Sequence, residues 1–108
     1  MNTIQNHVQL IGHLGDDPEK IQLENDKKLT KFSLATNLRY KNKDGESIEN
    51  TQWHRIVAWN KLADICLGNL KKGSHVACLG HLVYREYESK SGDKRQVTEI
   101  HLDELLML

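Results

Sequence analysis

Residues 51–59 read Thr51-Gln52-Trp53-His54-Arg55-Ile56-Val57-Ala58-Trp59, which is the pattern of a β-strand. Side chains alternate between the two faces of a strand, so Trp53, Arg55 and Trp59 are expected to point the same way. A face that combines flat aromatic rings with a guanidinium suits unpaired nucleobases, which stack on the rings while the cation meets phosphate. The stretch therefore favours binding of a single-stranded nucleic acid.

The alternative for the same stretch is an ordinary core strand. Tryptophan is well buried on average, and Val57 shares the face of both tryptophans. However, Ile56 and Ala58 can supply an apolar inner face from the opposite side of the strand. We therefore favour an exposed aromatic face over a buried one.

Length and cysteine content limit the class of protein. A chain of 108 residues is near the common domain size, so residues 1–108 are expected to form a single domain with one core. Cys66 and Cys78 stand among apolar neighbours without CxxC spacing, which favours reduced thiols over a disulfide. The start of the chain lacks a signal-peptide pattern, and no apolar run is long enough to span a membrane. We expect a soluble, cytoplasmic (nucleoid-associated) protein without membrane contact.

The charge is balanced overall but unevenly distributed. Lys plus Arg and Asp plus Glu each number 15, whereas nucleic-acid-binding domains are often basic. Residues 16–26 hold five acids and one lysine, and residues 27–43 hold six cations and no acid. Such a run usually marks only a solvated face, but this one leads into the aromatic strand. A local positive field is thus compatible with zero net charge.

Alternating apolar positions and turn residues predict a β-rich chain. Strands are expected at residues 7–14, 20–23, 29–40, 51–59, 75–87 and 95–102. A polar, flexible loop is expected at 41–50, around Lys43-Asp44-Gly45. One helix is expected at 60–70, with Asn60 as its cap and with Leu62, Ala63, Cys66 and Leu70 at helical spacing. This order predicts an all-β fold with one short helix, a five-stranded Greek-key barrel of the oligonucleotide-binding (OB) type with extended hairpin loops.

Short motifs along nearly the whole chain carry a family resemblance. They are Ile11-Gly12-His13-Leu14-Gly15-Asp16-Asp17-Pro18-Glu19, Leu34-Ala35-Thr36, Thr51 to Val57, Lys61-Leu62-Ala63, Lys71-Lys72-Gly73-Ser74 and Gly80-His81-Leu82. In their order and spacing they resemble the bacterial single-stranded DNA-binding protein (SSB) family. The resemblance implies an OB fold that binds and protects single-stranded DNA without sequence specificity during replication, recombination and repair.

The resemblance also implies roles for individual residues. The family's base-stacking positions fall on Tyr40, Trp53, Trp59 and Tyr87; in its best-known members the first and last are tryptophan and the third is phenylalanine. The matching phosphate-binding cations are Lys41, Lys43, Arg55, Lys61, Lys72 and Arg85. His54 matches a histidine at a subunit contact, and the expected assembly is a homotetramer, although a dimer would also cover exposed strand edges. Tyr84 should face away from Tyr87 and pack.

Two features depart from the family pattern. Its members usually continue into a long polar tail with an acidic, apolar tip that recruits other replication proteins, whereas this sequence stops at Leu108. It is either a tail-less relative or a shortened form, so recruitment through that tip is in doubt. Glu86 and Glu88 flank Tyr87 on an arm that would be expected to be basic, and these carboxylates should weaken phosphate contact there.

Other classes of function have weaker support. A protein-interaction module on the same barrel, such as a primosome accessory factor, would keep the fold and lose the stacking rings. His75, Cys78 and His81 suggest a metal site, but on a strand Cys78 points away from both histidines. Catalytic motifs are missing, and a nuclease would need paired carboxylates at the barrel mouth. We expect neither an enzyme nor a cofactor nor a metal.

Overall fold

The computed structural model describes residues 4–108 as six strands and one helix. The elements are β1 (Val8–Leu14), β2 (Glu19–Gln22), β3 (Lys28–Lys41), β4 (Ser47–Trp59), α1 (Asn60–Asn69), β5 (His75–Glu88) and β6 (Lys94–Met107). No helix within residues 4–108 combines the length and apolar character needed to cross a membrane.

The strands close into a five-stranded barrel. The sheet runs in the order β1-β5-β6-β4-β3-β2, and β1 also pairs with β3, which closes the ring and leaves β2 as an added strand on β3. Closure requires a glycine at position 12, because a Cβ there would lie 2.1 Å from the carbonyl oxygen of Ala35. β4 and β6 pair in parallel, and the other pairs are antiparallel. The predicted OB barrel with one helix is confirmed.

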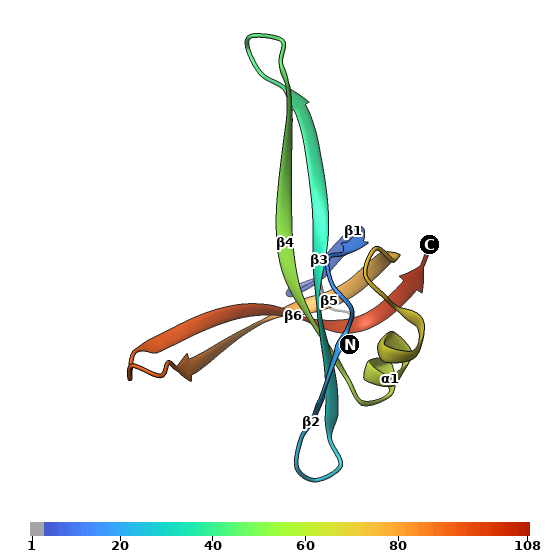
Figure 1. The fold of residues 1–108 in the computed structure, drawn as a ribbon, viewed down its shortest axis with the longest axis vertical. Coiled ribbons are helices and arrows are strands. Elements are labelled where there is room, and N and C mark those ends of the chain that lie inside the picture. Colours follow the sequence, from blue (N-terminus) through green and yellow to red (C-terminus); the bar gives the residue numbers. More distant parts are fainter. Residues whose placement is uncertain (1–3) are drawn as a thin grey trace.

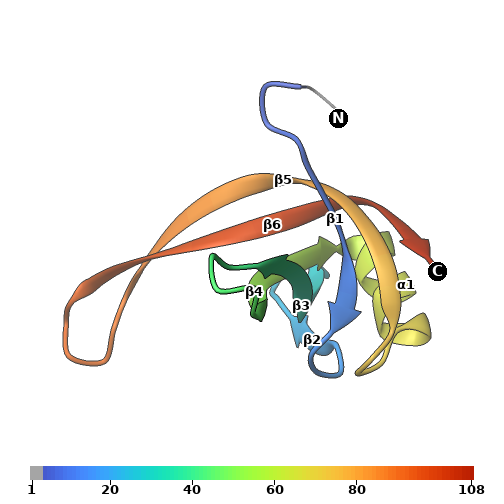
Figure 2. The ribbon, with the colours of Figure 1, turned by 90° about the horizontal axis from the view of Figure 1, so that it is seen from above.

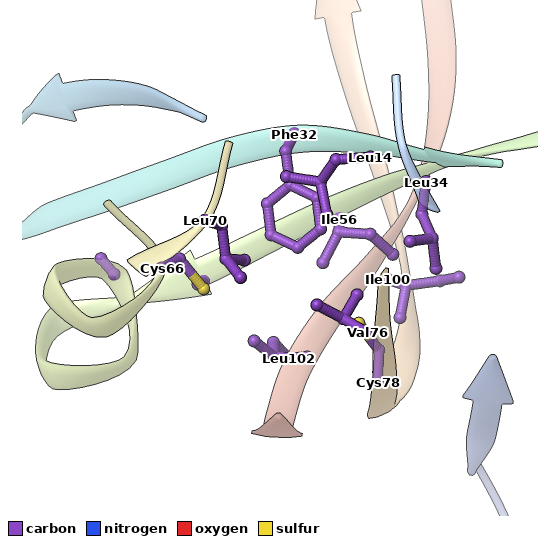
Figure 3. Close-up of a cluster of buried hydrophobic side chains, with 12 residues drawn as sticks. Leu14, Phe32, Leu34, Ile56, Cys66, Leu70, Val76, Cys78, Ile100 and Leu102 are labelled. Carbon is purple, nitrogen blue, oxygen red and sulfur yellow. The ribbon is translucent and has the colours of Figure 1, made fainter. Parts of the chain in front are cut away.

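The barrel interior is filled by alternate side chains of the strands and by one face of α1 (Figure 3). The core contains Leu14, Phe32, Leu34, Ile56, Ala58, Ala63, Cys66, Leu70, Val76, Cys78, Ile100 and Leu102. Ile56 and Ala58 are fully buried, as expected for the inner face of the aromatic strand. That face leaves the odd-numbered side chains of β4 outside the core.

The helix lies at the side of the barrel away from the β5–β6 turn (Figure 2). Ala63 and Cys66 are its buried residues, and the Thr30 hydroxyl donates a hydrogen bond of 3.0 Å to the Ala63 carbonyl oxygen. The prediction that Asn60 caps the helix is wrong. Asn60 is its first residue, with φ of 50°, and the preceding Trp59 makes no capping side-chain bond.

Two long hairpins leave the barrel in different directions (Figure 1). β3 and β4 remain paired as far as Lys41 and Ser47, so the predicted flexible loop at 41–50 is wrong in its extent: residues 41 and 47–50 are strand, and the turn is limited to 42–46. β5 and β6 remain paired as far as Glu88 and Lys94. We call these the β3–β4 arm (residues 37–51) and the β5–β6 arm (residues 83–99). Both arms extend the surface of the protein beyond the barrel itself.

Both cysteines are unpaired and buried. Burial raises the pKa of the Cys66 thiol to about 11 and that of the Cys78 thiol to about 12. Both groups are therefore protonated at neutral pH and unreactive as nucleophiles while the chain is folded. The position of Cys78 in the core also separates it from His75, whose ring is stacked on that of His13 with 4.3 Å between centroids.

Candidate nucleic-acid interface

Two open hollows lie between β4 and β6. The first, of about 610 Å³, is lined by Trp53, Arg55 and Thr98 among others, and the second, of about 420 Å³, includes Arg55, Arg85 and Tyr87. Ser33, Arg55 and Val97 belong to both, so the two hollows are direct neighbours. Each has the size of a small-ligand cleft. We call the two hollows together the central groove.

Trp53 lies open at one end of the central groove. Its side chain is 62% exposed, and its ring lies over Gly15, where a Cβ would come within 2.3 Å of the indole Cζ3. Any larger residue at position 15 would displace the ring. Sequence reasoning used Gly15 as part of a family motif without relating it to Trp53, so this support for the indole was missed.

Trp59 is held differently from Trp53. It is half-buried and lines neither hollow, although it has the same strand parity. Its indole Nε1–H donates a hydrogen bond of 3.1 Å to Nδ1 of His101 on β6. Val57, between Trp59 and Arg55 on that face, is buried beneath the central groove. The shared face predicted for the odd residues of β4 is thus only partly open.

The two tyrosines predicted to stack lie on different arms. Tyr40 is 50% exposed on the β3–β4 arm, opposite Ile48, and Tyr87 is 46% exposed on the β5–β6 arm, where it lines the second hollow. The four predicted aromatic positions are therefore spread over the groove, both arms and the end of β4. Tyr84 is 62% exposed, so the expectation that it packs is wrong within this chain.

The six predicted phosphate-binding cations fall into two groups. Arg55 and Arg85 line the central groove. Lys41 and Lys43 lie at the end of the β3–β4 arm, Lys61 in the first turn of α1, and Lys72 in the turn that follows the helix. All six residues are exposed. The four lysines line neither hollow of the central groove.

A buried carboxylate lies beneath the groove. Glu99 on β6 is only 4% exposed and accepts hydrogen bonds from Arg85, at 3.0 Å from Nη2 and 3.4 Å from Nε. His101 Nε2 lies 3.3 Å from Glu99 Oε1, and Lys31 Nζ lies 4.0 Å from Glu99 Oε2. We call Glu99, Arg85, His101 and Lys31 the Glu99 cluster.

Electrostatics in this cluster keep Glu99 ionised. Burial pushes its pKa upward, but the hydrogen bonds from Arg85 and His101 and the charges of Arg85 and Lys31 together hold that pKa below its ordinary value. The hydrogen bond to Glu99 in turn raises the pKa of Arg85. Because the folded-state pKa of Glu99 is lowered, its stabilising effect is present above about pH 4.3 and is lost as the pH falls further.

The central groove is therefore not uniformly cationic, although the sequence suggested a local positive field beside the aromatic strand. Asp16 and Glu19 line the second hollow together with Glu99, opposite Lys31, Arg55 and Arg85. Asp16 also accepts a hydrogen bond from the Ser33 hydroxyl at 3.0 Å. The three cations of the second hollow are therefore matched by three carboxylates.

Sequence reasoning missed Glu99 and His101. Both alternate with Ile100 and Leu102, whose side chains are in the core. That alternation on a predicted strand was a sufficient signal that the odd residues of β6 face outward, beside those of β4.

His54 has the opposite parity to Trp53 and is partly buried. Its Nε2 lies 2.9 Å from the Thr36 hydroxyl, across the β3–β4 pair. Burial lowers the pKa of His54, so the imidazole is mainly neutral at neutral pH and its hydrogen bond with Thr36 does not carry a full charge.

Comparison with known proteins identifies the family. The family model described as the single-strand binding protein family matches residues 5–108. Single-stranded DNA-binding protein 1 of Chlorobaculum tepidum is 47% identical over 104 residues, covering 95% of this chain and 64% of the relative. The single-stranded DNA-binding protein of Xylella fastidiosa is 40% identical, covering 95% of this chain and 63% of the relative. The chain thus spans somewhat less than two thirds of these proteins.

A solved structure gives the same result for the fold. The chain is similar, with a TM-score of 0.88 and 33% sequence identity, to a structure described as the Plasmodium falciparum SSB complex with single-stranded DNA. The match covers 100% of this chain and 99% of that one. From its barrel topology, its sequence and its family match, this chain belongs to the single-strand binding protein family.

Proposed function

We propose that residues 1–108 form one domain that binds and protects single-stranded DNA without sequence specificity during replication, recombination and repair. The bases stack on Tyr40, Trp53, Trp59 and Tyr87, and no bond is made or broken. The main support is the exposure of large rings beside guanidinium groups in the central groove, at Trp53 with Arg55 and at Tyr87 with Arg85.

The spread of the rings supports an extended ligand. Tyr40 and Tyr87 lie on separate arms (Figure 1), and the protein measures 56 Å along its longest axis. A compact ligand cannot reach both arms, whereas a flexible single strand can follow a path over several platforms. Duplex DNA cannot use these rings, because its bases are already stacked on one another.

The cations support contact with the sugar-phosphate backbone. Arg55 is exposed and has no carboxylate partner among the ion pairs of residues 4–108. Arg85 shares its guanidinium with Glu99, which uses only part of its five N–H donors. Lys41, Lys43, Lys61 and Lys72 extend the phosphate path beyond the central groove.

A binding experiment separates this function from a protein-interaction module. We expect a fluorescent oligothymidylate to bind much more tightly than the same sequence as a duplex, with an affinity that falls with salt at a log-log slope of about −0.7 per phosphate contacted. Arg55→Ala should flatten that slope by about one contact. Equal binding of single strand and duplex, or no salt dependence, would contradict the proposal.

The assembly is a separate proposal. We infer that the chain forms a homotetramer with His54 at a subunit contact, in the cytoplasm and associated with the nucleoid. β1 supports an assembly, because it pairs with β3 only at His13 and Leu14 and otherwise leaves that edge open. Multi-angle light scattering should give four times the mass of the chain, and His54→Glu should lower the mass because it puts a carboxylate into the contact. A monomeric parent would contradict it.

A further inference from the structure

Trp59 and the Glu99 cluster are joined through one histidine. Trp59 Nε1–H donates to Nδ1 of His101, and Nε2 of His101 lies against Glu99 Oε1. An indole nitrogen can only donate, so Nδ1 of His101 must accept and cannot carry a proton. The remaining ring proton is therefore on Nε2, which donates to the carboxylate. The chain of contacts runs from the indole through the imidazole to a buried charge.

The half-buried indole of Trp59 is held by His101, which is itself held by Glu99. The Glu99 carboxylate is itself held by Arg85 on β5, so the tautomer and orientation of His101 are set by a group anchored across two strands. The rings of Trp59 and His101 are tilted by 42° with centroids 6.0 Å apart, which indicates an edge contact through the hydrogen bond. His101 therefore does not stack on the π-face of the Trp59 ring.

We infer that His101 is a positioning residue that fixes the Trp59 indole for base stacking and releases it when Nδ1 is protonated. The inference rests on the proposed binding of single-stranded DNA, and it deepens that proposal by giving one platform a pH-dependent support. Protonation places an N–H opposite the indole N–H, so the bond to Trp59 is lost. The imidazolium is then attracted toward Glu99, which draws the ring away from Trp59.

Several charged groups face His101 besides Glu99. On β5, the His81 ring is 5.8 Å away by centroids and pairs with Asp103 of β6 at 3.1 Å, and Arg85 lies beyond the carboxylate. From β3, Lys31 reaches Glu99. The test must therefore isolate the contribution of His101 from these neighbouring groups.

The spectroscopic test uses a Trp53→Phe background, in which Trp59 is the one remaining indole of the sequence. Without DNA, we expect His101→Phe to shift the Trp59 emission, because the indole N–H loses its acceptor. His101→Gln retains an acceptor and a donor, so it should restore the parent emission. Lowering the pH from about 8 to about 5.5 should shift emission in the parent background and leave His101→Gln unchanged. Identical emission in all three proteins at both pH values would overturn the inference.

A binding cycle with oligothymidylate completes the test. His101→Phe should weaken binding about 2- to 12-fold, the effect of one hydrogen bond, and should have no further effect when Trp59 is already Phe. An equal loss in both backgrounds would show that His101 acts through Glu99 alone and would overturn the inference. A parent that does not bind the oligonucleotide would instead refute the proposed function, while the emission measured without DNA would still decide whether His101 holds the indole.

Discussion

Trp53→Ala is expected to weaken binding of single-stranded DNA by about 1 to 3 kcal/mol, or about 5- to 150-fold, and to leave the fold intact. The ring is 62% exposed and lies over Gly15, so its removal takes away a stacking surface without opening a cavity. Fluorescence anisotropy of a labelled oligothymidylate measures the affinity, and circular dichroism checks the fold.

Tyr84→Ala is the matched control for Trp53→Ala. Tyr84 is also 62% exposed, but it lines neither hollow of the central groove. We expect its removal to change the affinity by less than about twofold, as for an uninvolved surface residue. A Trp53→Ala variant that binds as tightly as the parent, or a Tyr84→Ala variant that is equally impaired, would contradict the assignment of the groove.

Leu34→Ala is expected to destabilise the chain by about 2 to 5 kcal/mol, the range for a buried leucine reduced to alanine. Leu34 is fully buried in the barrel core, where the lost methyl groups leave a cavity that the closed sheet cannot collapse into. Urea denaturation followed by circular dichroism gives the change in free energy of unfolding.

Leu38→Ala provides the comparison on the same strand and with the same parity. Leu38 is 61% exposed, because β3 has left the barrel and entered the β3–β4 arm at that position. Its replacement should cost less than about 0.5 kcal/mol. A similar loss for both leucines would contradict the boundary between barrel and arm.

These two leucines also illustrate what the sequence could and could not predict. Alternation predicted the strands, and the inner face that it predicted at Ile56 and Ala58 is in the core. Alternation alone does not distinguish Leu38 from Leu34, because the period of a strand is the same inside and outside a barrel. Where a hairpin leaves the barrel depends on closure by β1 against β3 and β5, which is a long-range property.

The arms were misjudged for a related reason. Lys43-Asp44-Gly45 correctly marked a turn, and Gly45 has a positive φ of 78°. The polar residues on either side of it suggested a loop, yet they pair as strand, because an arm exposed on both faces has no apolar pattern to reveal it. Asn60 resembled a helix cap by residue type, but β4 continues directly into α1.

The sequence predicted several of the residues that line the candidate site but not the contacts that join them. Trp53, Arg55, Arg85 and Tyr87 do line the central groove, whereas Tyr40, Trp59 and the four predicted lysines do not. The buried Glu99 was not predicted, since a carboxylate on a strand is expected at the surface unless a partner from another strand neutralises it. That partner, Arg85, becomes its neighbour only through the β5–β6 pairing.

The most direct test of the central claim uses Trp59→Phe, in which Trp53 is the one indole of the sequence. The variant is titrated with oligothymidylate while Trp53 emission and the anisotropy of a labelled oligonucleotide are recorded together. The account predicts that Trp53 emission is quenched in proportion to binding, because a base stacks on the ring. Binding seen by anisotropy with unchanged Trp53 emission would contradict it.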